Sequence, residues 1–450
     1  MLTVKTIPAD RTARASARRA GWVLIASLLW LACSAPPQAA AQTDELGGPP
    51  INYLTAEVDD RVAKLAARIE DGSTTLEYDE QHGYLRAVLD ELDIPVSSQV
   101  LVFSKTSLQL HCISPRRPRA LYFNDDTYVG WCQRGDVIEI ISTDAQQGAT
   151  FYTLKQSSAA PTRLSRDAGT CLSCHSTSRT QEVPGYLVRS VFSDIAGRPD
   201  LSQGSFTTDQ TSPLSERWGG WYVTGTHGGM RHMGNVVLKK DETALDVEAG
   251  ANLKSLDHLF DTEPYLSGHS DMVALMVLEH QTQMHNAIAA ANYETRRALH
   301  QSFEMNEILG REPGFVSDIA QRRIESSADQ VLQYLLMCDE FPLEGKVAGT
   351  TAFADDFQAR GICDSSGRSL RDFDLERRLF RYPCSYLIYS PAFDGLPDPV
   401  RSRVLIKLRD ILQGDDPSGR YSHLSPEDRQ AILDILRDTK PEFAELLGVP

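Results

Sequence analysis

The amino-acid sequence predicts an α+β fold with N-terminal helices plus an antiparallel β-meander, a β-rich middle and a helical C-terminal region. Apolar residues first recur at helical spacing, and short alternating runs separated by turn pairs then take over between residues 99 and 154. A later stretch, residues 272–299, contains neither glycine nor proline and predicts one long helix. With 41% hydrophobic and 24% charged residues, the 450-residue chain has a globular composition, which excludes fibrous and polytopic membrane proteins.

Two amphipathic helices are expected near the start, after a polar lead-in over residues 42–55. Their apolar side chains recur three and four residues apart, the spacing of one helix face. These residues are Val58, Val62, Leu65 and Ile69 in the first helix and Leu85, Val88, Leu89 and Leu92 in the second. Each helix therefore has one face to bury against the strands that follow.

Strand-like runs then form the predicted meander. They cover residues 99–103, 108–113, 120–123, 128–131, 137–141 and 150–154. Turn-forming pairs such as Asn124-Asp125 and Arg134-Gly135 separate them. A polar stretch at 158–169 predicts a loop. Further strand-like runs follow at 186–192, 218–224 and 235–238.

The C-terminal region is predicted to be helical. Helices are expected over residues 272–299, 316–337, 399–412 and 426–438. Ser270 is the expected N-cap of the first of these helices and Ser425 that of the last. The predicted organisation is a meander domain over 42–160, a middle region over 161–265 and a helical region over 266–450.

The chain is acidic, with a formal net charge of −16 and a pI of about 5.2. Nucleic-acid binding rests on neutralising phosphates with Lys and Arg, so this balance argues against nucleic acid as the main partner. A neutral or cationic partner is expected instead.

Residues 1–41 have the three parts of a secretory signal peptide. Basic residues precede an apolar run of 13 residues, 21–33, and small residues ending at Ala41 offer a cleavage site. The run is shorter than the roughly 20 residues that a transmembrane helix needs, so no transmembrane anchor is expected. A lipid anchor at Cys33 stays open as an alternative, although Trp30 fits the lipoprotein cleavage motif poorly. The sequence therefore predicts a periplasmic or secreted protein of the bacterial envelope, cleaved near Ala41.

Cys171, Cys174 and His175 form a Cys-x-x-Cys-His motif, the attachment sequence of c-type haem. Two thiols one helical turn apart can bond the two vinyl groups of haem through thioethers, and the adjacent histidine can bind the iron from the proximal side. Such attachment takes place outside the bacterial cytoplasm, in agreement with the export signal. We expect one covalent haem c in this middle region, with Cys171 and Cys174 binding the cofactor and His175 as proximal iron ligand.

Other uses of a Cys-x-x-Cys pair fit the sequence less well. A zinc site needs a second ligand pair at similar spacing, and the other cysteines form none. A thioredoxin-like dithiol lies at a helix start after a strand of a βαβ unit, whereas residues 158–169 predict a loop. A dithiol, a zinc site and a plain disulfide remain the alternatives.

At this motif the chain resembles c-type cytochromes. It departs from the small, all-helical cytochromes c and is more similar to large single-haem cytochrome c-domain proteins of bacterial envelopes. The similarity extends through residues 217–228, RWGGWYVTGTHG, and residues 382–390, YPCSYLIYS. The resemblance implies covalent haem and an axial histidine, but no mechanism, because the roles of these proteins are mostly unassigned.

The second axial iron ligand decides between electron transfer and chemistry at an open site. Candidate distal ligands gather in residues 227–233, HGGMRHM, which lie 52 to 58 residues after His175. His232 and Met233 are the favoured candidates and His227 the next. The alternative is a surface turn whose methionines only pack.

A second group of candidates lies on the predicted long helix: Glu279, His280, Met284 and His285. His280 and Met284 share a helix face, but His285 is rotated from His280 by about 140°, so one metal ion cannot easily bind both histidines. His280 could serve as a distal acid or base, or bind a second metal with Glu279. The simpler interpretation is that these side chains pair with their neighbours.

The other cysteines could form disulfides in an oxidising compartment. Cys112 and Cys132 lie in neighbouring predicted strands and could bridge a hairpin. Cys363 and Cys384 are a second possible pair, which leaves Cys338 buried among apolar neighbours. Spacing alone does not fix the connectivity.

Two hypotheses for function follow. The first is an exported single-haem electron-transfer protein that exchanges electrons with an envelope redox partner protein. The second is a haem-dependent oxidoreductase of peroxidase-like type, or a redox or gas sensor, with an open distal site. The haem-attachment motif supports the first hypothesis. The second is favoured by the length of the chain, which is large for a protein that only carries one haem.

Overall fold

An antiparallel sheet of seven strands organises the N-terminal half of the protein. The computed structural model describes residues 46–239 and 246–448, and its main sheet has the order β10-β1-β2-β3-β4-β5-β6. The strands are β1 (Val100–Val102), β2 (Arg119–Phe123), β3 (Thr127–Cys132), β4 (Val137–Asp144), β5 (Gly148–Lys155), β6 (Leu164–Arg166) and β10 (Trp221–Tyr222). Consecutive strands from β1 to β6 pair with each other, which confirms the predicted meander. β10 arrives from far along the chain and pairs with the free edge of β1.

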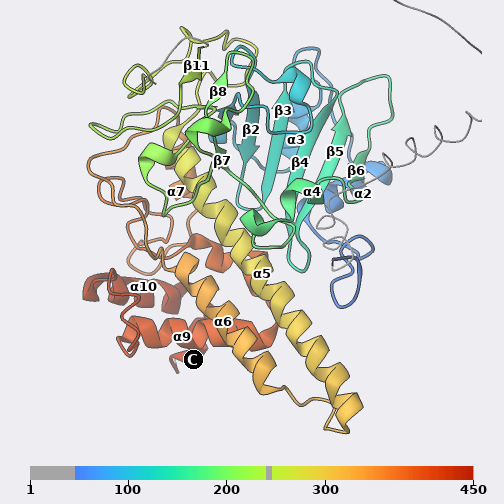
Figure 1. Ribbon diagram of the computed structural model, residues 1–450, viewed down its shortest axis with the longest axis vertical. Coiled ribbons are helices and arrows are strands. Elements are labelled where there is room, and N and C mark those ends of the chain that lie inside the picture. The colour runs from blue at the N-terminus through green and yellow to red at the C-terminus, as the bar shows by residue number, and fades with distance from the viewer. Residues whose placement is uncertain (1–45, 240–245, 449–450) are drawn as a thin grey trace, which may run out of the picture. The chain divides into compact units, whose positions relative to one another are not determined.

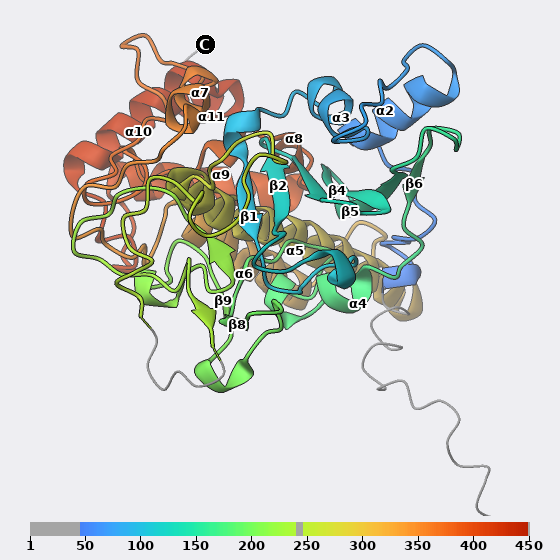
Figure 2. The ribbon, with the colours of Figure 1, turned by 90° about the horizontal axis from the view of Figure 1, so that it is seen from above.

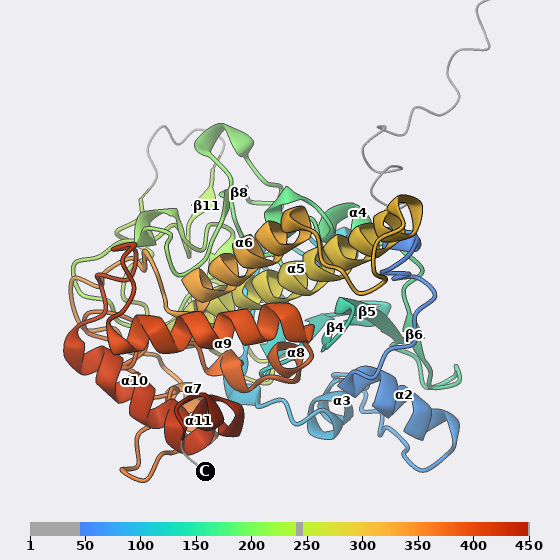
Figure 3. The ribbon, with the colours of Figure 1, turned by 90° about the horizontal axis from the view of Figure 1, so that it is seen from below.

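Both faces of this sheet are buried, because successive side chains of a strand point to opposite faces. Leu101, Tyr122 and Tyr152 pack on one face with the apolar residues of two N-terminal helices. Val102 and Phe151 pack on the other face with the apolar residues of a long helix. Figures 2 and 3 show the sheet between these two helical layers.

The two N-terminal helices are α2 (Arg61–Glu70) and α3 (Leu85–Glu91), as the apolar spacing predicts. Asp60 caps α2, because its Oδ1 accepts from the peptide N–H groups of Val62 and Ala63. The Oδ2 of Asp60 accepts from the hydroxyls of Thr150 and Tyr152 on β5 at 2.9 and 2.6 Å. One buried carboxylate thus fixes α2 against the sheet.

Two predictions in the meander region are wrong. Residues 108–113 contain no strand but the 3-10 helix Leu110–Cys112, because the Cys112 peptide N–H turns back to the Gln109 carbonyl. Residues 158–169, expected as a loop, contain β6, which pairs antiparallel with β5. That antiparallel pairing differs from the parallel βαβ arrangement of a thioredoxin-like motif.

The middle region has less strand than the sequence predicts. Its other strands are β7 (Arg189–Ser190), β8 (Ser193–Asp194), β9 (Phe206–Thr207) and β11 (Val237–Leu238), each two residues long. The run 218–224 is broken because Trp218 and Gly220 have φ of 66° and 79°, left-handed conformations that turn the backbone out of an extended strand. In the last predicted run, 235–238, the left-handed φ of 66° at Asn235 confines the strand to the two residues of β11.

The long helix is α5 (Met272–Leu309), ten residues longer than the prediction, and it pairs with α6 (Asp318–Leu335) in an antiparallel hairpin (Figure 1). α5 continues until Gly310, whose left-handed φ of 63° ends it. Its N-cap is Asp271 and not Ser270. The Ser270 hydroxyl is taken by the sheet, since it accepts from Leu101 N–H and donates to the Tyr222 carbonyl.

The remaining helices are α4 (Leu172–His175), α7 (Phe353–Ala359), α8 (Pro391–Asp394), α9 (Asp398–Gln413), α10 (Pro426–Thr439) and α11 (Pro441–Leu446). The predicted helices at 316–337, 399–412 and 426–438 are confirmed as α6, α9 and α10. Ser425 caps α10 as predicted, in a reciprocal capping box with Asp428. α9 packs across α6, as Figure 3 shows.

The described residues from Leu46 onward belong to one compact unit, so the predicted regions 42–160, 161–265 and 266–450 share a continuous apolar core. The predicted signal peptide, with Cys33 and the cleavage site at Ala41, lies outside the described residues. Among the helices that the structure describes, none is both long and apolar enough to cross a bilayer.

Candidate functional site

Cys171, Cys174 and His175 lie on a single turn of helix. The peptide N–H groups of Cys174 and His175 both donate to the Cys171 carbonyl, at 3.2 and 3.0 Å. Cys171 is half-buried and Cys174 is exposed. Two thiols therefore leave one turn next to a histidine, the arrangement that thioether attachment of haem requires.

Asp167 fixes where this turn begins. Its Oδ2 accepts from the peptide N–H groups of Gly169 and Cys171 at 2.8 and 3.0 Å. Burial, reinforced by Asp167, raises the pKa of the Cys171 thiol to about 12. A redox dithiol needs the opposite shift, because its attacking cysteine must be a thiolate. The environment of Cys171 thus argues against the dithiol alternative.

His175 is held from two directions by one residue, Gly185. The His175 carbonyl accepts from the Gly185 N–H at 2.8 Å, and the His175 Nδ1 lies 2.9 Å from the Gly185 carbonyl. A carbonyl can only accept, so Nδ1 carries the proton and Nε2 keeps its lone pair. Burial lowers the pKa of His175, which keeps the ring neutral at pH 7. A neutral imidazole with Nδ1–H bonded to a carbonyl is the form that binds iron or other metals through Nε2.

α5 holds the Gly185 segment in turn. Asn286 accepts from the Tyr186 N–H through Oδ1 at 2.8 Å and donates to the Tyr186 carbonyl through Nδ2 at 2.9 Å. The Asn286 carboxamide thus hydrogen-bonds both backbone groups of Tyr186, as a neighbouring strand would. The position of His175 is therefore set by a chain of contacts from α5 through Asn286 and Gly185.

Gly185→Ala is expected to destabilise the fold by about 2 kcal/mol and to disturb His175. A Cβ at this position would overlap Asn286 Oδ1 and lie 3.1 Å from Thr180 Cβ, so the Gly185 backbone would have to move. Gly345→Ala is the matched control, since its Cβ would meet nothing within 4 Å. Thermal unfolding of both variants measures the difference. Equal stabilities would show that Gly185 is not closely packed.

The distal candidates His227 and His232 already use their lone-pair nitrogens. His232 Nδ1 accepts from the Gly234 N–H at 3.0 Å, and His227 Nε2 accepts from the Asn252 N–H at 3.0 Å. Burial lowers the pKa of His232 to about 3 and also lowers that of His227, so both rings are neutral. A neutral ring has one unprotonated nitrogen. In this structure that nitrogen of each ring already accepts a hydrogen bond from a backbone N–H group.

Met233 differs from the two histidines. Its buried sulfur accepts one hydrogen bond, from the Ser190 hydroxyl at 3.5 Å, and a thioether sulfur keeps a second lone pair. Ser190 follows Arg189, whose pKa is lowered by burial and by Arg179 while the nearby Cys174 opposes the shift. Of the three distal candidates, Met233 alone retains a lone pair, and its hydrogen-bond partner Ser190 follows Arg189, on which Cys174 acts electrostatically.

The candidates on the long helix point to different neighbours. Glu279 forms a buried ion pair with Arg217, with Oε2 and Nη1 3.1 Å apart. His280 Nε2 lies 2.7 Å from the Ser385 hydroxyl, and His285 Nε2 donates to the Asp125 carbonyl at 2.7 Å. Met284 is fully buried in the core.

These partners keep Glu279 and His280 apart, so the structure does not assemble the second metal site considered for them. Across residues 46–239 and 246–448, no group of three or more His, Cys, Asp or Glu side chains is arranged to hold a metal ion.

The seven cysteines of the described chain are free thiols, so the expected disulfides are absent there. Cys363 is exposed whereas Cys384 is fully buried in the main core, and the two cannot meet. Cys112 and Cys132 do share a small apolar cluster, but the Cys112 thiol donates to the Arg134 carbonyl at 3.6 Å. Cys338 is buried, as predicted.

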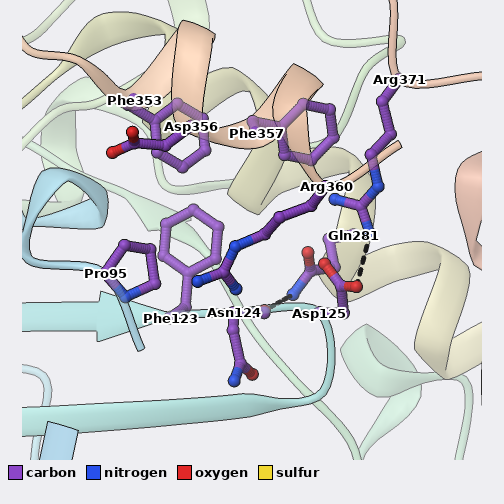
Figure 4. A pocket seen from close by; sticks show the side chains of 10 residues that line it. All are labelled: Pro95, Phe123, Asn124, Asp125, Gln281, Phe353, Asp356, Phe357, Arg360 and Arg371. Atoms are coloured by element: carbon purple, nitrogen blue, oxygen red, sulfur yellow. Dashed lines mark hydrogen bonds and ion pairs between the residues drawn. The ribbon is translucent and has the colours of Figure 1, made fainter. Parts of the chain in front are cut away.

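A cavity of about 460 Å³ lies elsewhere, beside the turn between β2 and β3. Arg371 lines it together with a smaller neighbouring pocket, where it pairs with Asp125 as Figure 4 shows. The Arg371 guanidinium stacks between the rings of Phe357 and Tyr386, 4.6 and 4.4 Å from their centroids. Neither cavity includes a residue of the Cys-x-x-Cys-His motif.

Sequence reasoning identified the motif but missed Gly185, Asn286 and Arg217. Each acts through contacts with residues far along the chain, and no spacing pattern marks them. Comparison of the chain with models of protein families, with curated proteins and with solved structures gives no match.

Proposed function

We propose that this protein is an exported c-type cytochrome with one covalent haem, and that it transfers electrons to or from another envelope protein. The main support is the state of His175. Its ring is neutral, its Nδ1–H is bonded to Gly185, and its Nε2 lone pair is left for iron. The two thiols on the same turn supply the attachment points.

The residues present fit a haem group. Cys171 and Cys174 are free thiols, and the His175 ring bonds the Gly185 carbonyl through Nδ1, which leaves Nε2 for a metal. The haem would be attached at Cys171 and Cys174, with His175 as its proximal ligand, and when bound it supplies a one-electron redox couple. Ordering by Asp167 and Gly185 holds this turn ready before attachment.

The surroundings suit exchange with a protein partner. Cys174 is exposed, so a cofactor attached there would be accessible to a docked molecule. The net charge of −16 favours a partner that presents a cationic surface. The signal-like residues 1–41 support an exchange in the periplasm or outside the cell.

In this proposal Met233 would be the second residue that holds the iron, because its sulfur keeps a lone pair while the lone pairs of His227 and His232 are used. The test is the optical spectrum of the exported protein, oxidised and reduced, with and without carbon monoxide. We expect a low-spin spectrum that carbon monoxide does not change, and we expect Met233→Leu to bind carbon monoxide readily.

Met230→Leu is the matched control for this experiment. Its sulfur is also buried and also accepts one hydrogen bond at 3.5 Å, from the Glu344 N–H. Its spectrum is expected to stay that of the unmodified protein. A high-spin haem that binds carbon monoxide without any substitution would instead favour the oxidoreductase or sensor function with an open distal site.

A further inference from the structure

A buried ion pair lies next to the segments that hold the candidate haem site. Arg217 is 4% exposed and Glu279 is 0% exposed, and Nη1 of the arginine lies 3.1 Å from Oε2 of the glutamate. Arg217 makes two more hydrogen bonds, to the carbonyls of Ser212 and Gln210 at 2.8 and 3.0 Å. The guanidinium is thus fixed in place, while the second carboxyl oxygen of Glu279 remains unbonded.

Two donors face that carboxyl without bonding it. The Thr208 hydroxyl and the Trp218 indole N–H are close enough to lower the pKa of Glu279, yet both are buried and lack a hydrogen-bond partner in the described chain. The Thr208 hydroxyl can rotate to donate to an ionised Glu279 Oε1 or to accept from a protonated one, whereas the indole N–H of the buried Trp218 can only donate. A protonated carboxyl and a carboxylate would both find partners here.

Glu279 is linked to the His175 segment along one face of α5. Glu279, Gln283 and Asn286 are four and then three residues apart, so they share that face, and Gln283 and Asn286 are hydrogen-bonded at 3.3 Å. Asn286 holds the backbone next to Gly185, the partner of His175. Seven residues of helix separate Glu279 from Asn286, about 10 Å.

We propose that Glu279 is a redox-linked proton site. The proposal rests on the function proposed above. Glu279 takes up one proton from solvent when a one-electron donor protein reduces the haem at Cys171, Cys174 and His175. It releases that proton when the electron passes to an acceptor. The added electron is a negative charge in the low-dielectric protein interior, and it would increase the affinity of a buried carboxyl for a proton.

The charges around Glu279 set the working pH. Burial raises the pKa of Glu279 to about 7, Arg217 opposes that shift, and Asp209 adds to it. Burial also raises the pKa of Glu340 to about 7, and the same arginine opposes that shift. Burial thus moves the titration of Glu279 upward, toward neutral pH, where the charge of an added electron could change its protonation.

The test is the midpoint potential of the haem, measured by optical redox titration between pH 5 and 9. We expect the potential to fall as pH rises through neutrality, because proton uptake favours the reduced state at low pH. Glu279→Gln should remove this dependence, while the matched buried control Glu340→Gln should keep it. A dependence that survives in Glu279→Gln, or that Glu340→Gln abolishes, overturns the proposal.

Glu279→Asp covers the case in which Glu279→Gln does not fold. It keeps the charge but moves the carboxyl away from Arg217, so the pH at which the potential changes should shift; an unshifted profile overturns the proposal. Failure of the proposed function is distinguishable, because a chain without covalent haem has no potential to titrate. If the unmodified protein holds a haem whose midpoint potential does not change with pH, only the proton site at Glu279 is refuted and the proposed function stands.

Discussion

Replacement of both Cys171 and Cys174 by alanine is expected to abolish covalent haem. The two thiols leave one turn of helix beside His175, and no other cysteines form a Cys-x-x-Cys pair. Without them no thioether can form, so a denaturing gel stained for haem should show the band of the unmodified protein and none for the variant. Loss of the stain should be complete, since the sequence holds a single attachment motif.

Cys363→Ala is the matched control for this loss. Cys363 is also an exposed free thiol, but it lies outside the motif. Its haem stain should equal that of the unmodified protein. A normal stain in the Cys171/Cys174 variant would contradict the attachment site, and loss of the stain in Cys363→Ala would point to a fold-wide effect.

Asp271→Ala is expected to lower the free energy of unfolding by about 4 kcal/mol, because several buried donors lose their acceptor together. Asp271 is 1% exposed. Its Oδ1 accepts from Val273 N–H and Ala274 N–H at the start of α5, and its Oδ2 accepts from Thr350 N–H and from the N–H and hydroxyl of Thr351. Chemical denaturation monitored by circular dichroism measures the change.

Asp71→Ala provides the comparison. Asp71 is an exposed aspartate whose Oδ1 accepts from the Ser73 N–H at 2.8 Å, in contact with solvent. Its replacement is expected to cost less than about 0.5 kcal/mol. If the two variants were equally stable, the hydrogen bonds of the Asp271 carboxylate would not be what holds the start of α5 to residues 350–351.

The elements that the sequence predicts well are those decided within a few residues. Ser425 and Asp428 cap each other across one turn, and α10 begins where the sequence places it. α5 begins at Met272 as predicted, but its N-cap is Asp271 and not Ser270, because both residues are good caps and contacts with the sheet decide between them. The sheet takes the Ser270 hydroxyl, which leaves the cap to Asp271.

Strands in the middle region were overpredicted for a physical reason. The run from Trp218 contains β-forming aromatic residues, but its backbone turns because Gly219 and Gly220 let other segments approach closely. A Cβ at Gly219 would lie 2.9 Å from the Val191 backbone, and one at Gly220 would lie 2.6 Å from Ser104 Cβ. Such approaches depend on segments far along the chain and leave no periodic signal.

The candidate site likewise contains residues that the sequence predicts and residues that it does not. Cys171, Cys174 and His175 are recognised from five consecutive residues, since the chemistry of attachment sets their spacing. The groups that orient His175 and surround Glu279 come from elsewhere: Gly185 by a tight turn, Asn286 from α5 and Arg217 from the segment before β10. Only the folded chain brings these together.

The most direct test of a covalent haem is the mass of the intact protein, purified from the periplasm of a bacterium that attaches haem to exported chains. We predict the mass of the processed chain plus one haem, unchanged by denaturation, and the mass of the chain alone for the variant without Cys171 and Cys174. A periplasmic protein with the mass of the bare chain would contradict the haem assignment and the electron-transfer function built on it.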